Sequence, residues 1–268
     1  MPFLSMAAIN DPFPLGYSMG NNGTVLQTTG LSGRQPWTPA CFYADTLCFG
    51  LSGGGIDYYD PMDNSGPSRI AQAFGGTWYH RRKFTVKGSY AYLDGMGIYN
   101  EQQGVISMAF RALSAVSAGV EIEAYRAGLN DGGGDHSSFV QAGASLLVCA
   151  RLASFSLDVR GIPLKSPLDE GISPPPLVRA GVHTEANGLG AQGVLVEASK
   201  NGDYAFRVSV GEEYYITKNF SACAALAANP FMLFFGVTAS WTKSSASIAF
   251  VNHPVLGWSK GLCFDWAR

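Results

Sequence analysis

The stretch that decides the fold is Asp203-Tyr-Ala-Phe-Arg-Val-Ser-Val-Gly211, in which two kinds of side chain alternate. One face carries large apolar groups and the other carries small or polar groups: Tyr204, Phe206, Val208 and Val210 against Ala205, Arg207, Ser209 and Gly211. A period of two residues indicates a β-strand whose two faces meet different surroundings.

The same alternation recurs through most of the chain. Glu197 to Trp266 contains five or six such runs joined by very short turns, and earlier examples are Phe84–Leu93, Val105–Ala112 and Ala118–Tyr125. Alternating segments of about ten residues are the signature of a transmembrane β-barrel. Roughly 12 to 15 runs can be counted, and bacterial barrels favour an even number of strands. The sequence therefore predicts an all-β, transmembrane antiparallel barrel of about 14 strands (12–14).

Composition supports a surface in contact with lipid. Charged residues make up 14% of the chain, whereas a soluble domain averages roughly 25%. Aromatic residues fall near the expected strand ends, as in the girdles of membrane barrels: Tyr58, Tyr59, Trp78, Tyr79, Tyr92, Tyr214, Tyr215, Trp241 and Trp266. The net charge of −2 and the scattered basic residues argue against nucleic acid as a partner.

The cysteines give no support for a metal or a cofactor. There are five of them, with no Cys-x-x-Cys spacing and no clustered histidines. Zinc sites and thioredoxin-like chemistry need such spacings. We therefore expect neither a metal site nor a cofactor site.

Connections between the runs are of two lengths. Asp60–Pro67, Gly128–Asp135 and Gly161–Pro176 are long, and the last of them contains five prolines. Long loops at one end and short turns at the other are typical of outer-membrane barrels. No charge occurs between Lys218 and Lys243, which is long enough for a membrane helix. The Asn229-Pro230 pair within it favours two strands and a turn.

The first 37 residues differ from the rest because they are rich in glycine and lack a strand period. We expect residues 1–37 to form an irregular segment that plugs or caps a barrel built from residues 38–268. No basic residue precedes Arg34, so the start of the chain is not an ordinary signal peptide. The expected location in the outer membrane is therefore conditional on an export signal that this chain lacks.

Several motifs of the C-terminal half resemble those of PorV/PorQ-type outer-membrane barrels, relatives of the FadL fatty-acid transporters. The resemblance covers roughly residues 70–268 and is carried by Glu197-Ala-Ser-Lys200, Tyr204–Val210, Gly211-Glu-Glu-Tyr-Tyr215, Asn219-Phe220, Pro175-Pro-Leu-Val-Arg-Ala-Gly181 and His253-Pro-Val-Leu-Gly257. The chain departs from the family at Cys223 and Ala225, where arginine and glycine are usual. It also lacks the family's N-terminal Asn-Pro-Ala-Gly-Leu signature.

The resemblance implies passage of small hydrophobic compounds, or a membrane-embedded role in secretion or envelope assembly. The implied partners are outer-membrane lipid, secretion-system components and the barrel-assembly machinery. That machinery reads aromatic C-terminal strands, which Leu262, Phe264 and Trp266 resemble.

Charged residues on the polar faces are the candidate site. If the barrel is correct, they point into the lumen, either as structural ion pairs or as the lining of a passage: Glu121, Glu123, Asp158, Arg160, Glu197 and Arg207. Asp135-His136-Ser137 could suggest a lipid hydrolase, but adjacent strand residues point to opposite faces, which is the wrong geometry for a Ser–His pair. We therefore expect a protein that is not an enzyme. The alternatives are an outer-membrane lipid hydrolase, a purely structural barrel, and a soluble β-sandwich in which Tyr204, Phe206, Val208 and Val210 pack on a second sheet.

Overall fold

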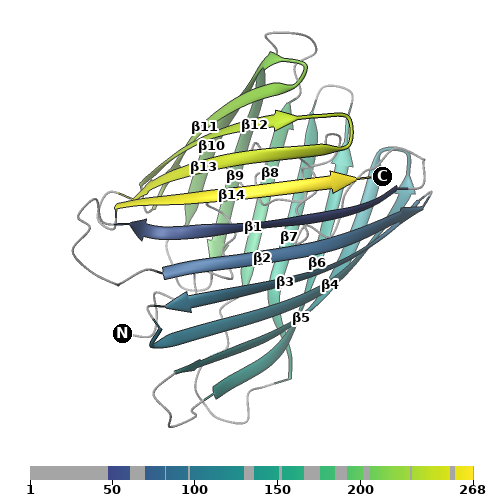
Figure 1. Ribbon diagram of the computed structural model, residues 1–268. Coiled ribbons are helices and arrows are strands. Elements are labelled where there is room, and N and C mark those ends of the chain that lie inside the picture. Colours follow the sequence, from purple (N-terminus) through teal and green to yellow (C-terminus); the bar gives the residue numbers. More distant parts are fainter. Residues whose placement is uncertain are drawn as a thin grey trace.

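The described residues of the protein form an antiparallel β-barrel of fourteen strands, seen here in a computed structural model (Figure 1). The structure describes residues 48–60, 70–81, 83–95, 97–129, 136–150, 153–165, 176–184, 192–201, 206–229, 231–253 and 257–267. The expected N-terminal segment, residues 1–37, lies outside the described residues. The expected strand number of 14 is confirmed.

The strands follow one another around the wall in chain order. They are β1 (Cys48–Asp60), β2 (Ile70–Arg81), β3 (Phe84–Gly95), β4 (Tyr99–Leu113), β5 (Val116–Leu129), β6 (His136–Cys149), β7 (Ser154–Lys165), β8 (Leu177–Thr184), β9 (Gln192–Asn201), β10 (Arg207–Thr217), β11 (Phe220–Ala228), β12 (Met232–Ser240), β13 (Ser244–His253) and β14 (Gly257–Ala267).

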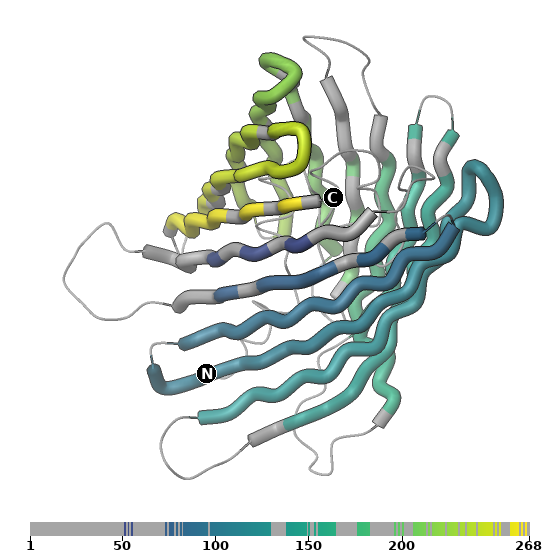
Figure 2. The backbone as a smooth tube through the Cα atoms, turned by 45° about the vertical axis from the view of Figure 1, so that its right-hand side comes forward, coloured from purple at the N-terminus to yellow at the C-terminus, as the bar shows by residue number. Residues whose placement is uncertain are grey.

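Pairing between the first and the last strand closes the barrel. β1 lies antiparallel to β14, with register partners that run from Gly50 with Ala267 to Asp60 with Trp258. Figure 1 shows these two strands side by side although they come from opposite ends of the described chain. The tube view shows how strongly the wall curves between β2 and β7 (Figure 2). Closure leaves no unpaired sheet edge. A sheet that spans a membrane must be closed in this way, because lipid offers no hydrogen-bond partner to backbone groups.

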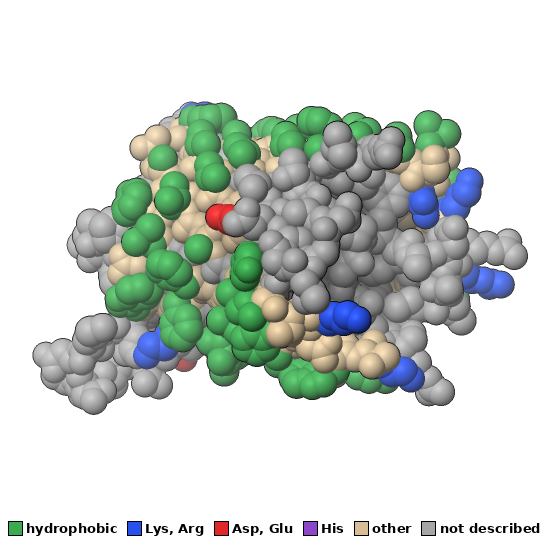
Figure 3. Space-filling view, turned by 90° about the horizontal axis from the view of Figure 1, so that it is seen from above, with side chains coloured by type: hydrophobic (Ala, Val, Ile, Leu, Met, Phe, Trp, Pro, Cys, Tyr) green, Lys and Arg blue, Asp and Glu red, His purple; other side chains and the backbone are tan. Residues whose placement is uncertain are grey.

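Exposure alternates along each strand as the sequence predicts. On β5 the side chains of Glu121, Glu123 and Tyr125 are buried, whereas those of Val120 and Ile122 are about 60% and 57% exposed. Seen from above, hydrophobic side chains lie around the outside of the described surface (Figure 3). The apolar groups therefore face outwards, as in a barrel surrounded by lipid, and the polar groups face inwards.

The soluble-sandwich alternative is wrong. Phe206, Val208 and Val210 are 53%, 39% and 41% exposed, so they do not pack against a second sheet. Tyr204 lies outside the described residues.

The uncharged run between Lys218 and Lys243 forms two strands, β11 and β12, which confirms the turn expected at Asn229. Asn229 adopts a positive φ of 59°, and its side-chain amide donates a hydrogen bond of 3.0 Å to the carbonyl oxygen of Phe206. No helix in the described part of the chain is long and apolar enough to cross a membrane.

One expected loop is shorter than the sequence suggested. β7 continues through Gly161 and Pro163 to Lys165, so the loop expected from Gly161 to Pro176 begins later. The register with β6 shifts near this point, and Gly161 adopts a positive φ of 74°. A bulge with glycine in the left-handed region lets a strand continue past an irregularity, and proline is tolerated at such places.

A charge on the outward face tests the lipid-facing assignment. Ile122→Arg, at the middle of β5, should destabilise the protein folded in lipid vesicles by ~2–4 kcal/mol, because a basic side chain near the membrane midplane is poorly solvated. Urea unfolding followed by tryptophan fluorescence measures the change, with Ile122→Leu as the matched control. Equal stability of the two variants would show that this face meets water instead of lipid.

Candidate functional site

A cluster of ionisable side chains lies on the inner face of β5, β7 and β8. We call Glu121, Glu123, Asp158, Arg160 and Arg179 the charged cluster; all five are buried. Asp158 lies directly opposite Arg179 in the pairing of β7 with β8. Opposite strand residues share a face, so the register itself brings these groups together.

Arg160 links two acidic residues of the cluster. Its Nε atom lies 2.8 Å from Oδ2 of Asp158, to which it donates a hydrogen bond, and 3.3 Å from Oε1 of Glu121. The Nε atom of Arg179 lies 3.9 Å from the same Asp158 oxygen. Buried charges are tolerated when they are paired and hydrogen-bonded, so these contacts compensate for the loss of hydration inside the wall.

Glu123 is held by amide side chains on the two neighbouring strands. Gln141 on β6 donates from Nε2 to Oε2 at 2.5 Å, and Gln103 on β4 donates from Nε2 to Oε1. Both carboxylate oxygens of Glu123 therefore accept a hydrogen bond. This arrangement ties β4, β5 and β6 together on the inner face.

The space for Glu121 depends on a glycine across the strand pair. Gly143 on β6 pairs with Glu121 on β5, and a Cβ atom added at Gly143 would lie 2.6 Å from Oε1 of Glu121. That separation is shorter than a van der Waals contact. A larger residue at position 143 would force the carboxylate away from its place beside Arg160.

The structure places the six sequence-predicted residues in different surroundings. It brings Glu121, Glu123, Asp158 and Arg160 together on one inner face. Arg207 lies apart on β10, where its Nη2 atom is 3.7 Å from the sulfur of Met232. Glu197 pairs through its backbone with Ser209 and Gly181, but its side chain lies outside the described side chains.

Sequence reasoning missed three residues that belong to the charged cluster or donate hydrogen bonds to it: Arg179, Gln103 and Gln141. Arg179 lies in the alternating run Leu177-Val-Arg-Ala-Gly181, so the period of two could have placed it inside. Which residues would meet across strands depends on register, and loops of uncertain length do not fix the register.

An aromatic pair lies beside Glu123 and Gln141 on the inner face. It is one row closer to the end of the barrel where β5 leads to β6. Tyr125 on β5 is directly opposite Phe139 on β6, and their rings stack with centroids 4.6 Å apart and planes 22° apart. Both side chains are buried, as are Ala91 and Ala127 nearby on the inner face. These four side chains form a buried apolar and aromatic patch next to the charged cluster.

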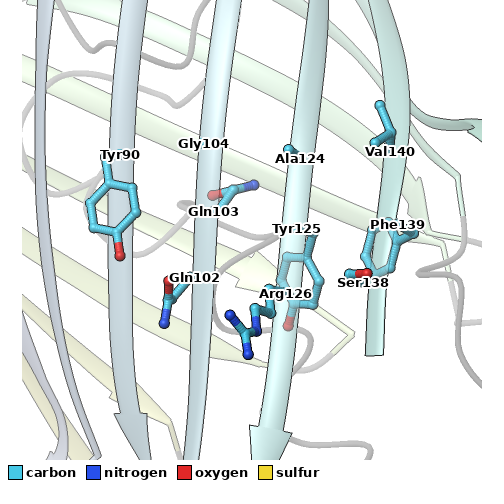
Figure 4. A pocket seen from close by; sticks show the side chains of 10 residues that line it. All are labelled: Tyr90, Gln102, Gln103, Gly104, Ala124, Tyr125, Arg126, Ser138, Phe139 and Val140. Atoms are coloured by element: carbon cyan, nitrogen blue, oxygen red, sulfur yellow. The ribbon is translucent and has the colours of Figure 1, made fainter. Parts of the chain in front are cut away.

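The outer face behind this region carries a hollow of about 430 Å³ across β3 to β6. Figure 4 shows its lining, with the side chains of Tyr90, Gln102 and Arg126 projecting on one side of the sheet. The register aligns Gln102, Arg126 and Ser138 in one row and Tyr90, Gly104, Ala124 and Val140 in the next. The hollow exists because Gly104 and Ala124 are small.

The hydrolase alternative gains nothing from the described residues. Ser138 is exposed on the outer face and lies opposite Arg126. Asp135 and the side chains of His136 and Ser137 lie outside the described part. Within that part no group of three or more His, Cys, Asp or Glu residues could hold a metal ion.

Removal of Arg160 tests the pairing in the charged cluster. Arg160→Met leaves Asp158 and Glu121 buried without their closest cation, so it should destabilise the barrel by ~3–5 kcal/mol. Denaturant unfolding in detergent measures the loss, with Lys243→Met in the exposed turn between β12 and β13 as the control. Unchanged stability of Arg160→Met would show that the cluster does not hold the wall together.

Comparisons with known proteins find relatives by fold alone. No family model matches the chain, and no curated protein matches its sequence. The toluene transporter TbuX of Ralstonia pickettii matches with a TM-score of 0.66 at 10% identity, over 95% of this chain and 96% of that one.

Two further solved structures share the architecture. The monoaromatic hydrocarbon channel CymD matches with a TM-score of 0.57 at 10% identity, over 84% of this chain and 88% of that one. The outer membrane protein Omp33 of Acinetobacter baumannii matches with a TM-score of 0.50 at 11% identity, over 82% and 97%. The fold of this chain is therefore that of an outer-membrane β-barrel, similar to barrels that carry small hydrocarbons.

Proposed function

We propose that the protein is an outer-membrane barrel through which small hydrophobic compounds pass. The observation that carries the proposal is the closed fourteen-strand wall, apolar outside and polar inside, which shares its architecture with a toluene transporter and a monoaromatic hydrocarbon channel. The alternation of exposed and buried side chains supports placement in the membrane. The similar fold of the toluene transporter and the hydrocarbon channel supports a small hydrophobic compound as the solute.

Inside the wall, we assign solute contact to the patch around Tyr125 and Phe139. Stacked rings with small apolar neighbours offer a small hydrophobic compound both area and a π-face. The buried charges beside the patch are engaged with one another and with glutamine amides. In this proposal the charged cluster shapes and stiffens the wall, and the aromatic patch meets the solute.

The candidate lumen residues divide by role in this proposal. Glu121, Glu123, Asp158 and Arg160 belong to the stiffening cluster, whereas Arg207 on β10 contributes to the lining of the interior beyond it. Glu197 stays a candidate for that lining through its place on β9. Residues 1–37 would plug or cap the lumen. Neither stiffening the wall nor lining the lumen involves a chemical reaction, so the protein proposed here is not an enzyme.

The narrower PorV/PorQ relation is part of the same proposal. It would add secretion-system components as partners, and it would make β14, with Leu262 and Phe264 outward, the strand read by the barrel-assembly machinery. The fold neighbours favour the transport side of this proposal, because two of them are described as a transporter and a channel.

Uptake measurements test the transport proposal. Gram-negative cells that carry the protein in their outer membrane should take up radiolabelled toluene several times faster than cells with an empty vector. Uptake of a hydrophilic disaccharide should be unchanged. Tyr125→Ala should lower toluene uptake by roughly two- to tenfold, the loss expected from one aromatic contact, whereas Tyr125→Phe keeps the ring and should retain uptake.

Folding and transport are separated by measuring the barrel in the same cells. Heat-dependent gel mobility of the outer-membrane fraction reports how much folded protein is present. Folded wild-type protein without toluene uptake above the vector level would reject transport and leave the purely structural barrel.

A further inference from the structure

We propose that the hollow on the outer face of β3 to β6 binds the phosphate group of a membrane lipid, with Arg126 as the anchoring residue. The claim goes beyond transport through the lumen, because the hollow lies on the opposite side of the wall. It rests on the position of one outward arginine, on the register around it and on empty space beside it.

Arg126 lies on the outer face of β5, in one row with Gln102 and Ser138. It is the cationic side chain of this row within the described parts of β3 to β6. It is exposed, and Gln102 and Ser138 lie directly opposite it on the two neighbouring strands. Arginine, a glutamine amide and a serine hydroxyl together supply several donors pointing the same way from a sheet. Such a set matches phosphate oxygens, which arginine binds with two parallel hydrogen bonds.

The row of donors lies at the border of the apolar band. Towards the turn between β4 and β5, the outward residues next to it are apolar, among them Ile106, Met108, Val120 and Ile122. Arg126 is three residues from the end of β5, which is about 10 Å along a strand. A basic side chain at this level costs roughly 0–1 kcal/mol, against ~2–4 at the midplane. The donors therefore lie at the depth of lipid head groups.

The next row forms a recess that an acyl chain fits. Gly104 and Ala124 lie between Tyr90 and Val140, and a Cβ atom added at Gly104 would meet no atom within 4 Å. Tyr90 is 51% exposed at the edge of the recess. Polar donors above an apolar recess complement the phosphate group and the acyl chain of a lipid. Free phosphate would occupy only the donors, and a hydrocarbon would occupy only the recess.

The leaflet follows from the loops. Arg126 lies near the end of the barrel where residues 130–135 connect β5 to β6 and residues 166–175 lead towards β8. At the other end β4 and β5 are joined by two residues. Because outer-membrane barrels place their longer loops outside the cell, the lipid belongs to the outer leaflet.

Native mass spectrometry of the detergent-solubilised protein tests the proposal. At equal low concentrations, dimyristoyl phosphatidylglycerol should be retained as one molecule per chain, and dimyristoyl glycerol, which lacks the phosphate, should be retained about tenfold more weakly. Arg126→Gln should weaken phosphatidylglycerol retention to a similar extent. Arg81→Gln, which removes an exposed arginine at the far end of β2, should leave it unchanged.

A second pair of variants tests the recess without touching charge. Gly104→Leu should fill the hollow and lower phosphatidylglycerol retention, whereas Gly88→Leu, also with open space at its Cβ position, should not. Heat-dependent gel mobility checks that each variant is folded. Equal retention by wild type and Arg126→Gln, or binding of inorganic phosphate as tight as that of the lipid, would overturn the proposal.

Discussion

The pairing of β1 with β14 is the constraint on which the rest of this structure depends. In hydrocarbon, an unpaired backbone N–H or C=O group costs several kcal/mol, so a sheet can span a membrane only if it has no edge. The register from Gly50 with Ala267 to Asp60 with Trp258 removes both edges at once. With the wall closed, each strand must divide its side chains between lipid and interior, and the alternating sequence follows from that division.

Closure also explains why charged side chains can be concentrated on the inner face of the wall. Arg160, Asp158 and Glu121 lie on one inner face because β5 and β7 present alternate residues to the same space. The outer face of the same strands carries mainly apolar groups until the row of Arg126. The wall therefore separates two chemical roles, with a solute-facing aromatic patch inside and a lipid-facing recess outside in our proposals.

The sequence predicts the parts of this fold that local chemistry controls. The alternation from Ala118 to Tyr125 predicts strand β5 and the direction of Glu121 and Glu123, and the Asn229-Pro230 pair predicts the turn between β11 and β12. The continuation of β7 beyond Gly161 was not predicted, because a glycine followed by a proline looks like the start of a loop unless a bulge accommodates both.

The site is predicted less completely than the fold. The period of two tells which residues share a face, but the contacts between Glu123 and Gln141, and between Tyr125 and Phe139, require the register of β5 with β6. A shift of one residue would separate every one of these pairs. The hollow at Gly104 likewise depends on the alignment of four strands, β3 to β6, and no single strand sequence predicts it.

The most direct measurement of the central claim is a disulfide across the seam. In an otherwise cysteine-free protein folded in membranes, Gly53→Cys on β1 and Phe264→Cys on β14 occupy partner positions. A closed barrel predicts that mild oxidation links them. Gly53→Cys with Phe250→Cys on β13, a strand that pairs with β12 and β14, should stay unlinked. Absence of the first link in folded protein would contradict the closed barrel and the account built on it.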